Sequence, residues 1–404
     1  MPTTTPVTLQ KEAQKQLLDF SNTENAFCHK NDQELKKSAW LFRMMNHPWL
    51  VKVGSALGLK AVEWNLPFAR RIVKATIFEQ FCGGSTLLEC LPAIQKLKNF
   101  NTFTVLDYGA EGKESETDFN HTMNEAIRAL EFAAREKSVA IATVKVSGMG
   151  RMELLEKVNT QAPLTADEQE ECQHIVKRLD AVCYAAAERG VGVYIDAEES
   201  WIQNSIDALA DKMMARYNKK QIVVFNTFQM YRHDRLDFLK KSYIKCRQEN
   251  YLLGAKLVRG AYMLKEKKRA DELGLPSPIN PSKAATDQHY DDAVRFCVEN
   301  LEYISFCNAS HNAQSALLQT QLLAQKGIAA DHPHLMFSQL YGMSDNLTFN
   351  LAAAGYRVGK YMPYGTVQEV IPYLIRRAQE NTSVTGDMSR EYKLLEKEMK
   401  RRKL

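Results

Sequence analysis

The sequence predicts an α/β protein whose main domain is a TIM-like (β/α)8 barrel, and three observations favour this fold class. The 404 residues, of which 45% are hydrophobic and 25% charged, can bury a large core. After about residue 100, short β-branched runs alternate with segments of helical periodicity. Polar residues cluster directly after each run. An open doubly wound sheet uses the same units, but eight of them within about 300 residues favour a closed barrel.

Residues 1–100 are expected to form a helical arm before the barrel. From Ser38 to about Lys98, apolar residues recur every three or four positions with basic residues between them. The first thirty residues lack the basic start and apolar run of a secretory signal, and they lack the Arg-rich pattern of a transit peptide. The most apolar stretch, from Trp49 to Phe78, is interrupted by charged residues, so no membrane-spanning helix is expected.

The predicted strands follow one another along the rest of the chain. They lie at residues 102–109, 139–146, 191–199, 221–229, 254–262, 303–310, 334–342 and 355–365. Helical periodicity between them is clearest at residues 125–135, 167–188 and 366–379. The longest interruption, residues 263–288, contains Gly274 and several prolines and is expected to be a surface loop before a helix that ends near Asn300. The barrel domain is expected at 101–390, and a basic amphipathic tail at 391–404.

Charge and cysteine content exclude several classes of protein. Lys plus Arg number 53 and Asp plus Glu 48, and a formal net charge of +5 is too small and too dispersed to indicate a nucleic-acid partner. The eight cysteines contain no CxxC pair and are interpreted as reduced thiols in a cytosolic protein. His332 and His334 lack further ligands nearby, so no metal site is predicted. Gly148 and Gly150 follow a strand, but Glu153 replaces the last glycine of a dinucleotide-binding motif.

Charged residues inside the predicted strands are the first candidates for a site, because the reactive groups of such barrels lie at the carboxyl ends of the strands. Lys145, Asp196 and Lys256 lie in hydrophobic strands, where an unpaired charge costs several kcal/mol. They are therefore expected to pair with one another or with a ligand. Further polar side chains at strand ends are Asp107, Glu111, Glu198, Asn226, Gln229, Arg259, Tyr262, Ser310, His311, Gln339 and Tyr361.

A double arginine occurs in the last predicted helix of the barrel. Tyr373, Arg376, Arg377 and Glu380 share one face of this helix. Two adjacent guanidinium groups can bind one carboxylate or phosphate from two directions, whereas the alternative is an exposed, solvated helix face.

The residues alone allow two other functions. One is a Schiff-base barrel aldolase that uses Lys145 or Lys256, and the other is a non-catalytic barrel that binds a small carboxylate as a sensor or scaffold.

Six sequence segments carry a resemblance to a known family. VYIDAEE, FNTFQMY, KLVRGAY, ASHNAQ, QLYGM and YLIRRAQEN occur in this order, as they do in proline dehydrogenases. The chain resembles this family over roughly residues 100–390, and it is most similar to the monofunctional forms and to the first catalytic unit of bifunctional proline utilisation proteins. The resemblance implies FAD as cofactor, L-proline as substrate, Δ1-pyrroline-5-carboxylate as product and the first step of proline catabolism as the function.

The resemblance also assigns roles to single residues. Asp196 and Lys256 match positions treated as catalytic, and many family members have arginine in place of the lysine, beside flavin N5. The substrate carboxylate would be bound by Lys145, Arg376 and Arg377, with Glu111 pairing with Arg376 as a gate. The proline ring would be enclosed by Tyr262, Tyr361 and Tyr373. The FAD-contacting positions are Gln229, Arg259, Gly260, Ala261, Ser310 and His311.

Substrate choice and electron acceptor follow from the same resemblance. Relatives that act on 4-hydroxyproline carry serine where this chain has Tyr361, which favours proline because a phenol would crowd a ring hydroxyl. A membrane quinone, ubiquinone or menaquinone, is the implied acceptor. The implied location is the bacterial cytoplasm at the inner membrane, or the mitochondrial inner membrane in a eukaryote. The tail and the stretch Trp49–Phe78 could lie on an anionic bilayer, or they could pack on the barrel or be solvated. No second catalytic unit is expected in this chain.

Overall fold

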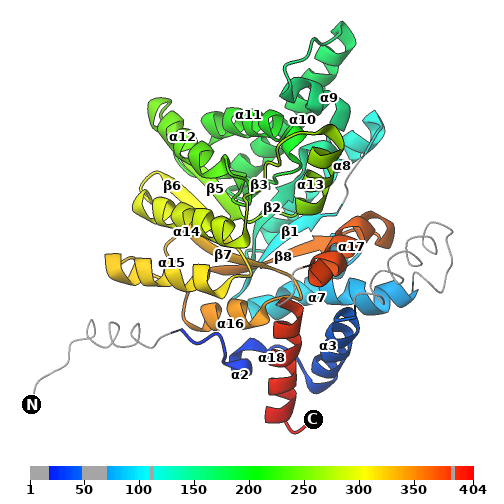
Figure 1. Ribbon diagram of the computed structural model, residues 1–404, viewed down its shortest axis with the longest axis vertical. Coiled ribbons are helices and arrows are strands. Elements are labelled where there is room, and N and C mark those ends of the chain that lie inside the picture. Colours follow the sequence, from blue (N-terminus) through cyan, green and yellow to red (C-terminus); the bar gives the residue numbers. More distant parts are fainter. Residues whose placement is uncertain (1–17, 48–70, 110–112, 384–386) are drawn as a thin grey trace, which may run out of the picture.

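Eight parallel strands form a closed barrel, so the predicted fold class is confirmed (Figure 1). The computed structural model describes residues 18–47, 71–109, 113–383 and 387–404. Each strand pairs with the next in chain order, and β8 closes the ring on β1. The strands are β1 (Phe103–Tyr108), β2 (Val139–Val144), β3 (Gly192–Ile195), β4 (Val224–Gln229), β5 (Leu253–Val258), β6 (Ile304–Ala309), β7 (Leu335–Leu340) and β8 (Val358–Tyr364).

All eight strands fall on predicted segments; most end within two residues of the prediction, and β3 and β5 end four residues before it. The β5 segment, for example, was expected to run to Tyr262 but leaves the sheet after Val258. The residues beyond each strand form the loops that carry the polar side chains. Inside the barrel, alternate strand residues such as Val105, Tyr194 and Phe225 pack into a core layer below these loops.

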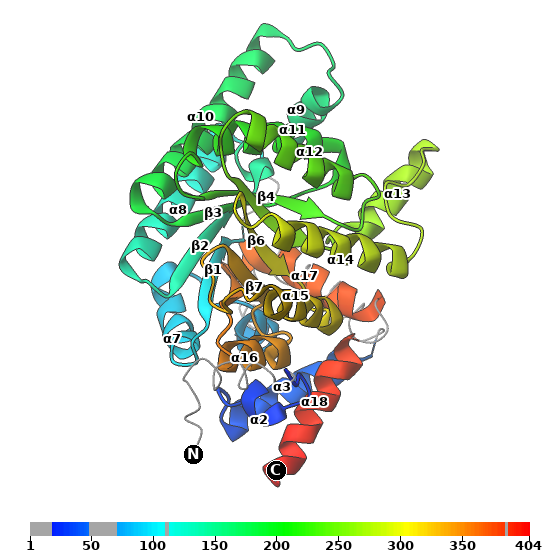
Figure 2. The same cartoon turned by 90° about the vertical axis from the view of Figure 1, so that its left-hand side faces the viewer.

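Helices surround the barrel on its outer side (Figures 1 and 2). They are α8 (Glu116–Arg135), α10 (Ala166–Arg189), α11 (Ser200–Tyr217), α12 (Arg235–Gln248), α14 (Lys283–Glu299), α15 (Ala313–Lys326) and α16 (Asp345–Ala353). A 3-10 turn at Val146–Gly148 and helix α9 (Met152–Asn159) lie between β2 and α10. The local signals for α10 are strong, because Thr165 and Glu168 form a capping box and Gly190 ends the helix at φ +62°. The predicted bounds of 167–188 therefore lie within one residue of the observed ends of α10.

The expected loop at 263–288 is wrong at both ends, because helix α13 (Met263–Leu273) occupies its first part and α14 begins at Lys283. The helix is rich in charged residues, but its Glu266 is buried and accepts hydrogen bonds from the Ser200 amide (2.7 Å) and hydroxyl (2.6 Å). Arg269 lies over the Trp201 ring at 4.5 Å. These contacts with α11 hold α13 over the barrel, and the proline-rich stretch connects it to α14.

Helix α17 (Val367–Ser383) carries the double arginine and crosses the carboxyl end of the barrel. Near its start, Glu369 accepts a hydrogen bond of 2.5 Å from the hydroxyl of Tyr108, the last residue of β1. Further along, the Arg376 guanidinium lies 5.7 Å from the ring of Tyr262, which follows β5 on the opposite side of the ring of strands. The predicted helix at 366–379 is confirmed, and its position brings the arginines to the strand ends.

Helices from both ends of the chain pack together beside β7 and β8 (Figure 2). They are α2 (Thr23–Ala26), α3 (Asp32–Met45), the π-helical turn Lys74–Phe78, α6 (Glu79–Phe81) and α18 (Asp387–Arg401). Helix α7 (Leu87–Lys98), by contrast, belongs to the same apolar cluster as the barrel wall.

The predicted tail forms α18 and packs against α3. Its Leu395 is buried in one cluster with Leu35 and Phe42. Arg402 donates to the backbone oxygens of Phe27 (2.9 Å) and Lys30 (2.8 Å). The apolar face of α18 is therefore covered by protein. Of the possibilities expected for the tail, which were contact with a bilayer, packing on the protein and exposure to solvent, packing is the one observed. Most of the stretch Trp49–Phe78 lies outside the described residues.

Candidate active site

The centre of the site is a buried cluster of three side chains that come from different strands. The Lys256 ammonium in β5 lies 2.6 Å from Asp196 Oδ1, beyond β3. The Tyr361 hydroxyl in β8 donates to the other oxygen, Oδ2, at 2.7 Å. All three side chains are buried. The expectation that the charges within the strands pair with one another is therefore correct for Lys256 and Asp196, and the structure adds a tyrosine to the pair.

Lys145 has a carboxylate partner that the sequence did not identify. Its ammonium lies 3.2 Å from Asp107 Oδ1, and the Thr143 hydroxyl donates to the same oxygen at 2.7 Å. Lys145 is only 9% exposed. Asp107 had been noted at the end of β1 without a role. Its position beside β2 lets it hold the Lys145 ammonium at the mouth of the barrel.

The two arginines of α17 lie in different surroundings. Arg377 is buried, with its guanidinium 5.2 Å from the Tyr373 ring. Arg376 is partly exposed and lies over the Tyr262 ring. Both arginines and both tyrosines therefore face the region above the strand ends, as the shared helix face predicted. Glu111 lies outside the described residues, so its role as a gate remains a prediction.

The predicted cofactor positions form a second group beyond β4, β5 and β6. Arg259 donates to the Ser310 hydroxyl (2.6 Å) and to Asp287 (2.8 Å). Gln229 donates from Nε2 to the Glu198 backbone oxygen at 2.9 Å, while its buried Oε1 has no hydrogen-bond partner among the residues that the structure describes. A buried acceptor without a partner is costly, so this oxygen is suited to a bound group that carries an N–H.

The backbone at Gly260, next to Ala261, approaches an aromatic ring closely. Gly260 has φ +138°, and a Cβ atom there would lie 2.5 Å from the Tyr231 ring. Only glycine therefore fits at this position. The turn leaves main-chain atoms rather than side chains next to Arg259, at the end of β5.

His311 is half-buried and has several cations near it. Its Nδ1 lies 2.8 Å from the Ser344 hydroxyl, and its backbone oxygen accepts from Arg390 at 3.0 Å. Burial lowers the pKa of His311 to about 3, and the cations Lys360 and Arg377 add to this shift. The imidazole is therefore neutral at physiological pH.

Comparison with known proteins identifies the family to which this site belongs. A family model described as proline dehydrogenase matches residues 90–390, which is well over half of the chain. The chain belongs to the proline dehydrogenase family. The resemblance seen in the six sequence segments is thereby confirmed.

Three curated relatives are similar to this chain over long stretches of sequence. Proline dehydrogenase 1, mitochondrial, of Dictyostelium discoideum is 32% identical over 374 residues, which are 82% of this chain and 65% of that protein. The human protein of the same name is 38% identical over 242 residues, 59% of this chain and 40% of its own length. Hydroxyproline dehydrogenase of Xenopus laevis is 29% identical and covers 99% of this chain and 94% of its own. The chain thus spans less than two thirds of the first two relatives.

Among solved structures, proline utilization A of Bdellovibrio bacteriovorus, inactivated by N-propargylglycine, superposes with a TM-score of 0.71. The identity is 20%, and the match covers 95% of this chain and 42% of that one. This likeness supports the barrel fold of the proline dehydrogenase family.

One buried carboxylate near the family's site was noted at a strand end but given no role. Glu198 follows β3 and accepts hydrogen bonds from the amide (3.0 Å) and the hydroxyl of Ser147. Burial raises the pKa of Glu198 to about 7, although the Ser147 hydrogen bonds act in the opposite direction. The carboxylate ties the turn after β2, which follows Lys145, to the loop after β3, which follows Asp196.

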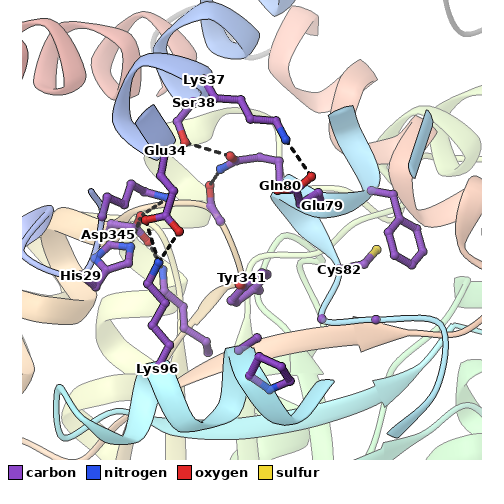
Figure 3. A pocket seen from close by; sticks show the side chains of 18 of the residues that line it. His29, Glu34, Lys37, Ser38, Glu79, Gln80, Cys82, Lys96, Tyr341 and Asp345 are labelled. Carbon is purple, nitrogen blue, oxygen red and sulfur yellow. Dashed lines mark hydrogen bonds and ion pairs between the residues drawn. The ribbon is translucent and has the colours of Figure 1, made fainter. Parts of the chain in front are cut away.

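A cavity of about 530 Å³ lies elsewhere, between the helical arm and the outer side of β8 (Figure 3). Its charged side chains pair with one another, as in Lys96 with Glu34 (2.7 Å) and Lys37 with Glu79 (2.7 Å). None of the predicted site residues within the described part of the chain lines this cavity. The candidate active site of this proline dehydrogenase family member is therefore the cluster at the strand ends.

Proposed function

We propose that this chain oxidises L-proline to Δ1-pyrroline-5-carboxylate with FAD as cofactor, and that the electrons pass to a membrane quinone. One observation supports this proposal beyond family membership. The side chains of Lys145, Lys256 and Arg377 are each less than 10% exposed and lie at the same end of the barrel. Buried cations at one end of a barrel suit an anionic guest, and a free amino acid carries a carboxylate.

The substrate would be held by its two ends. Lys145, Arg376 and Arg377 would bind the carboxylate, while Tyr262, Tyr361 and Tyr373 would enclose the ring. The ion pair with Asp107 limits the motion of Lys145, and burial limits that of Arg377. Such rigid placement is the main requirement for oxidation of a secondary amine, since the reacting C–H bond must point at the acceptor.

The residues proposed to hold FAD are suited to a flavin. Gln229 Oε1 accepts no hydrogen bond within the described part of the chain, so it could accept one from the flavin. Gly260 has no side chain that would cover its backbone. Arg259 is held in place by Ser310 and Asp287. FAD, when bound, accepts the hydride from the ring carbon beside the nitrogen. Asp196 and Lys256 would form the catalytic pair. Lys256 keeps a positive charge where many relatives have arginine, but as a single ammonium without forked geometry.

A second candidate is 4-hydroxyproline oxidation. The Xenopus laevis hydroxyproline dehydrogenase covers nearly the whole chain at 29% identity. Tyr361 favours proline, because its hydroxyl is fixed to Asp196 and its ring fills the space that a ring hydroxyl would need. We therefore propose proline as the preferred substrate.

Electron acceptor, location and chain organisation complete the proposal. Several relatives are named as mitochondrial proteins. In the part of the chain that the structure describes, no helix is both long and apolar enough to cross a bilayer. We propose peripheral contact with the bacterial inner membrane or the mitochondrial inner membrane, and ubiquinone or menaquinone as acceptor. We also propose the division into an arm at 1–100, an FAD-binding barrel at 101–390 and a tail at 391–404.

A product assay tests this proposal. The purified protein is incubated with L-proline and a soluble quinone analogue, and the pyrroline is trapped with o-aminobenzaldehyde. We expect turnover that requires both proline and quinone, with lower kcat/KM for trans-4-hydroxy-L-proline. Higher kcat/KM for hydroxyproline would support the second candidate, and the absence of pyrroline with either amino acid would overturn both.

A further inference from the structure

The C-terminal helix α18 reaches the predicted cofactor residues through its first turn. Arg390 donates to the His311 backbone oxygen at 3.0 Å. The next residue, Glu391, accepts a hydrogen bond of 2.9 Å from the Ser344 amide. The Ser344 hydroxyl in turn lies 2.8 Å from His311 Nδ1. Two adjacent residues of a helix at the end of the chain thus contact His311, one directly and one through Ser344.

Ser344 depends on an external partner because its backbone conformation is unfavourable. It has φ +48°, in the left-handed region that only glycine and a few polar residues visit readily. Ser344 is also the N-cap of α16, but its hydroxyl makes no capping bond and is directed to His311 instead. Glu391 therefore holds the amide of a strained residue, and that residue holds the imidazole.

The same loop is held from its other side by the helical arm. Gln80 in α6 donates to the Gly342 backbone oxygen at 2.8 Å, and Ser38 in α3 donates to Gln80 Oε1 at 3.0 Å (Figure 3). Gly342 has φ +76° and lies against Gln80 so closely that no Cβ atom fits. The loop between β7 and α16 is thus fixed at Gly342 by the arm and at Ser344 by α18.

The carboxylate of Glu391 is buried among other charged groups. Glu391 is 4% exposed, and the charged residues near it are Arg390, Lys360 and Asp345. Lys360 is itself paired with Asp345 at 2.8 Å, which also lies 3.3 Å from His29. A buried carboxylate is costly unless its hydrogen bonds are satisfied, so its burial for packing alone would be unfavourable.

We propose that Glu391 is a positioning residue for the cofactor site: by holding Ser344, it fixes the orientation of the His311 imidazole. The part of this inference that concerns FAD rests on the function proposed above. A serine hydroxyl can either donate to Nδ1 or accept from it. The Ser344 contact at Nδ1 therefore sets the orientation of the ring, and with it the direction in which Nε2 points.

Four variants separate this role from simple support of the fold. Glu391→Ala removes the acceptor, and Glu391→Gln keeps an oxygen for the Ser344 amide. Ser344→Gly removes the hydroxyl but tolerates the left-handed backbone. The matched control is Glu398→Ala, since Glu398 is another fully buried carboxylate of α18 but pairs with Arg401 and Arg402, away from His311.

Two readouts are measured on each variant: the FAD dissociation constant, and the imidazole resonances of the apoprotein labelled with 15N-histidine, with His311 assigned through His311→Asn. We expect Glu391→Ala and Ser344→Gly to shift the His311 nitrogen resonances and to weaken FAD binding by roughly tenfold, the effect of one lost hydrogen bond. Glu391→Gln should retain both values, and Glu398→Ala should lower the melting temperature without moving either.

Contrary outcomes are distinct from failure of the proposed function. If Glu391→Ala lowers the melting temperature as Glu398→Ala does but leaves the His311 resonances unchanged, Glu391 only supports the fold and the inference is wrong. If the wild-type protein binds no FAD, the proposed function is wrong, while the apoprotein resonances still decide whether Glu391 positions His311.

Discussion

At the residue scale, the site is organised by carboxylates that each hold more than one partner. Asp196 accepts from Lys256 on one oxygen and from Tyr361 on the other, and Asp107 contacts both Lys145 and Thr143. Each buried ammonium therefore has a fixed position before substrate arrives. Such preorganisation lowers the cost of orienting the proposed amino-acid substrate, since these side chains are already ordered before it binds.

The first residue-scale prediction concerns the buried arginine. Arg377→Met should raise the KM for L-proline by roughly tenfold to a hundredfold, because hydrogen bonds to charged groups contribute about 1.5–3 kcal/mol. The FAD dissociation constant should stay the same, since the lost contacts involve substrate only. Steady-state kinetics and flavin titration measure the two effects. Arg357→Met is the control, because Arg357 lies over Phe103 at the opposite end of the barrel, and an unchanged KM in Arg377→Met would refute the assignment.

The second residue-scale prediction concerns substrate choice. Tyr361→Ser should raise the ratio of kcat/KM for hydroxyproline over proline by roughly tenfold or more, since it opens space for a ring hydroxyl. Tyr361→Phe keeps the ring but removes the hydrogen bond to Asp196, so it should lower both kcat/KM values and leave their ratio unchanged. If Tyr361→Ser leaves the ratio as it is in the wild type, Tyr361 does not determine specificity.

At the scale of single elements, the loops after the strands decide where the side chains lie. The turn after β2 is tied by Ser147 to Glu198 beyond β3, and the turn after β5 is fixed by the contact of Gly260 with Tyr231. These two connections help to set the positions of Lys145 and Arg259, because the strands that precede these residues fix their positions only in part. Loss of either connection should disturb the site without dismantling the barrel.

The turn after β5 can be tested with glycine substitutions. Gly260→Ala should destabilise the protein by about 2–4 kcal/mol and weaken FAD binding, because the new methyl group meets the Tyr231 ring in an unfavourable backbone conformation. Gly274→Ala is matched to it, since Gly274 also has positive φ, at +64°, but nothing lies within 4 Å of its added Cβ. That control should cost only about 1 kcal/mol and leave FAD binding unchanged. Chemical denaturation measures both, and equal effects would contradict the steric argument.

The buried carboxyl group of Glu198 predicts that the stability of the protein depends on pH. The pKa of Glu198 is raised from 4.5 to about 7 in the folded protein, so the folded state binds the proton more tightly than the unfolded state does. This contribution is fully present below pH 4.5 and is lost as the pH rises through 7, with a total of roughly 3 kcal/mol. Glu198→Gln should therefore lose less stability than the wild type between pH 5 and pH 8.

Denaturation curves at several pH values measure this difference. The exposed Glu170→Gln serves as the control and should follow the wild-type profile. Parallel profiles for Glu198→Gln and the wild type would show that Glu198 does not titrate in this range. Glu391, whose pKa burial also raises to about 7, contributes in the same direction and remains in both proteins.

At the scale of the whole molecule, the sequence predicted the barrel well because its strands are short, β-branched and evenly separated by helices. It also predicted that Asp196 and Lys256 would pair with each other or with a ligand, since parallel strands bring their carboxyl ends together, and the structure shows the pair. It did not predict the packing of α18 against α3, because that packing joins residues more than 300 positions apart, such as Leu35 and Leu395.

Two further features escaped prediction for a related reason. Helix α13 is highly charged and is followed by prolines, so local composition indicated a loop, whereas the docking of Glu266 on Ser200 stabilises a helix. The link from Glu391 to Ser344 joins a terminal helix to a loop after β7, and no local periodicity records it. Contacts between distant segments of this kind can be seen only in the folded structure.

The most direct test of the proposed chemistry is the visible absorption spectrum of the purified protein, recorded before and after anaerobic addition of L-proline. We predict an oxidised flavin spectrum that L-proline bleaches, which would establish the cofactor, the substrate and the reductive half-reaction together. A flavin spectrum that L-proline leaves unchanged would contradict proline as the substrate, and a protein reconstituted with FAD that shows no bound flavin would contradict the proposed chemistry altogether.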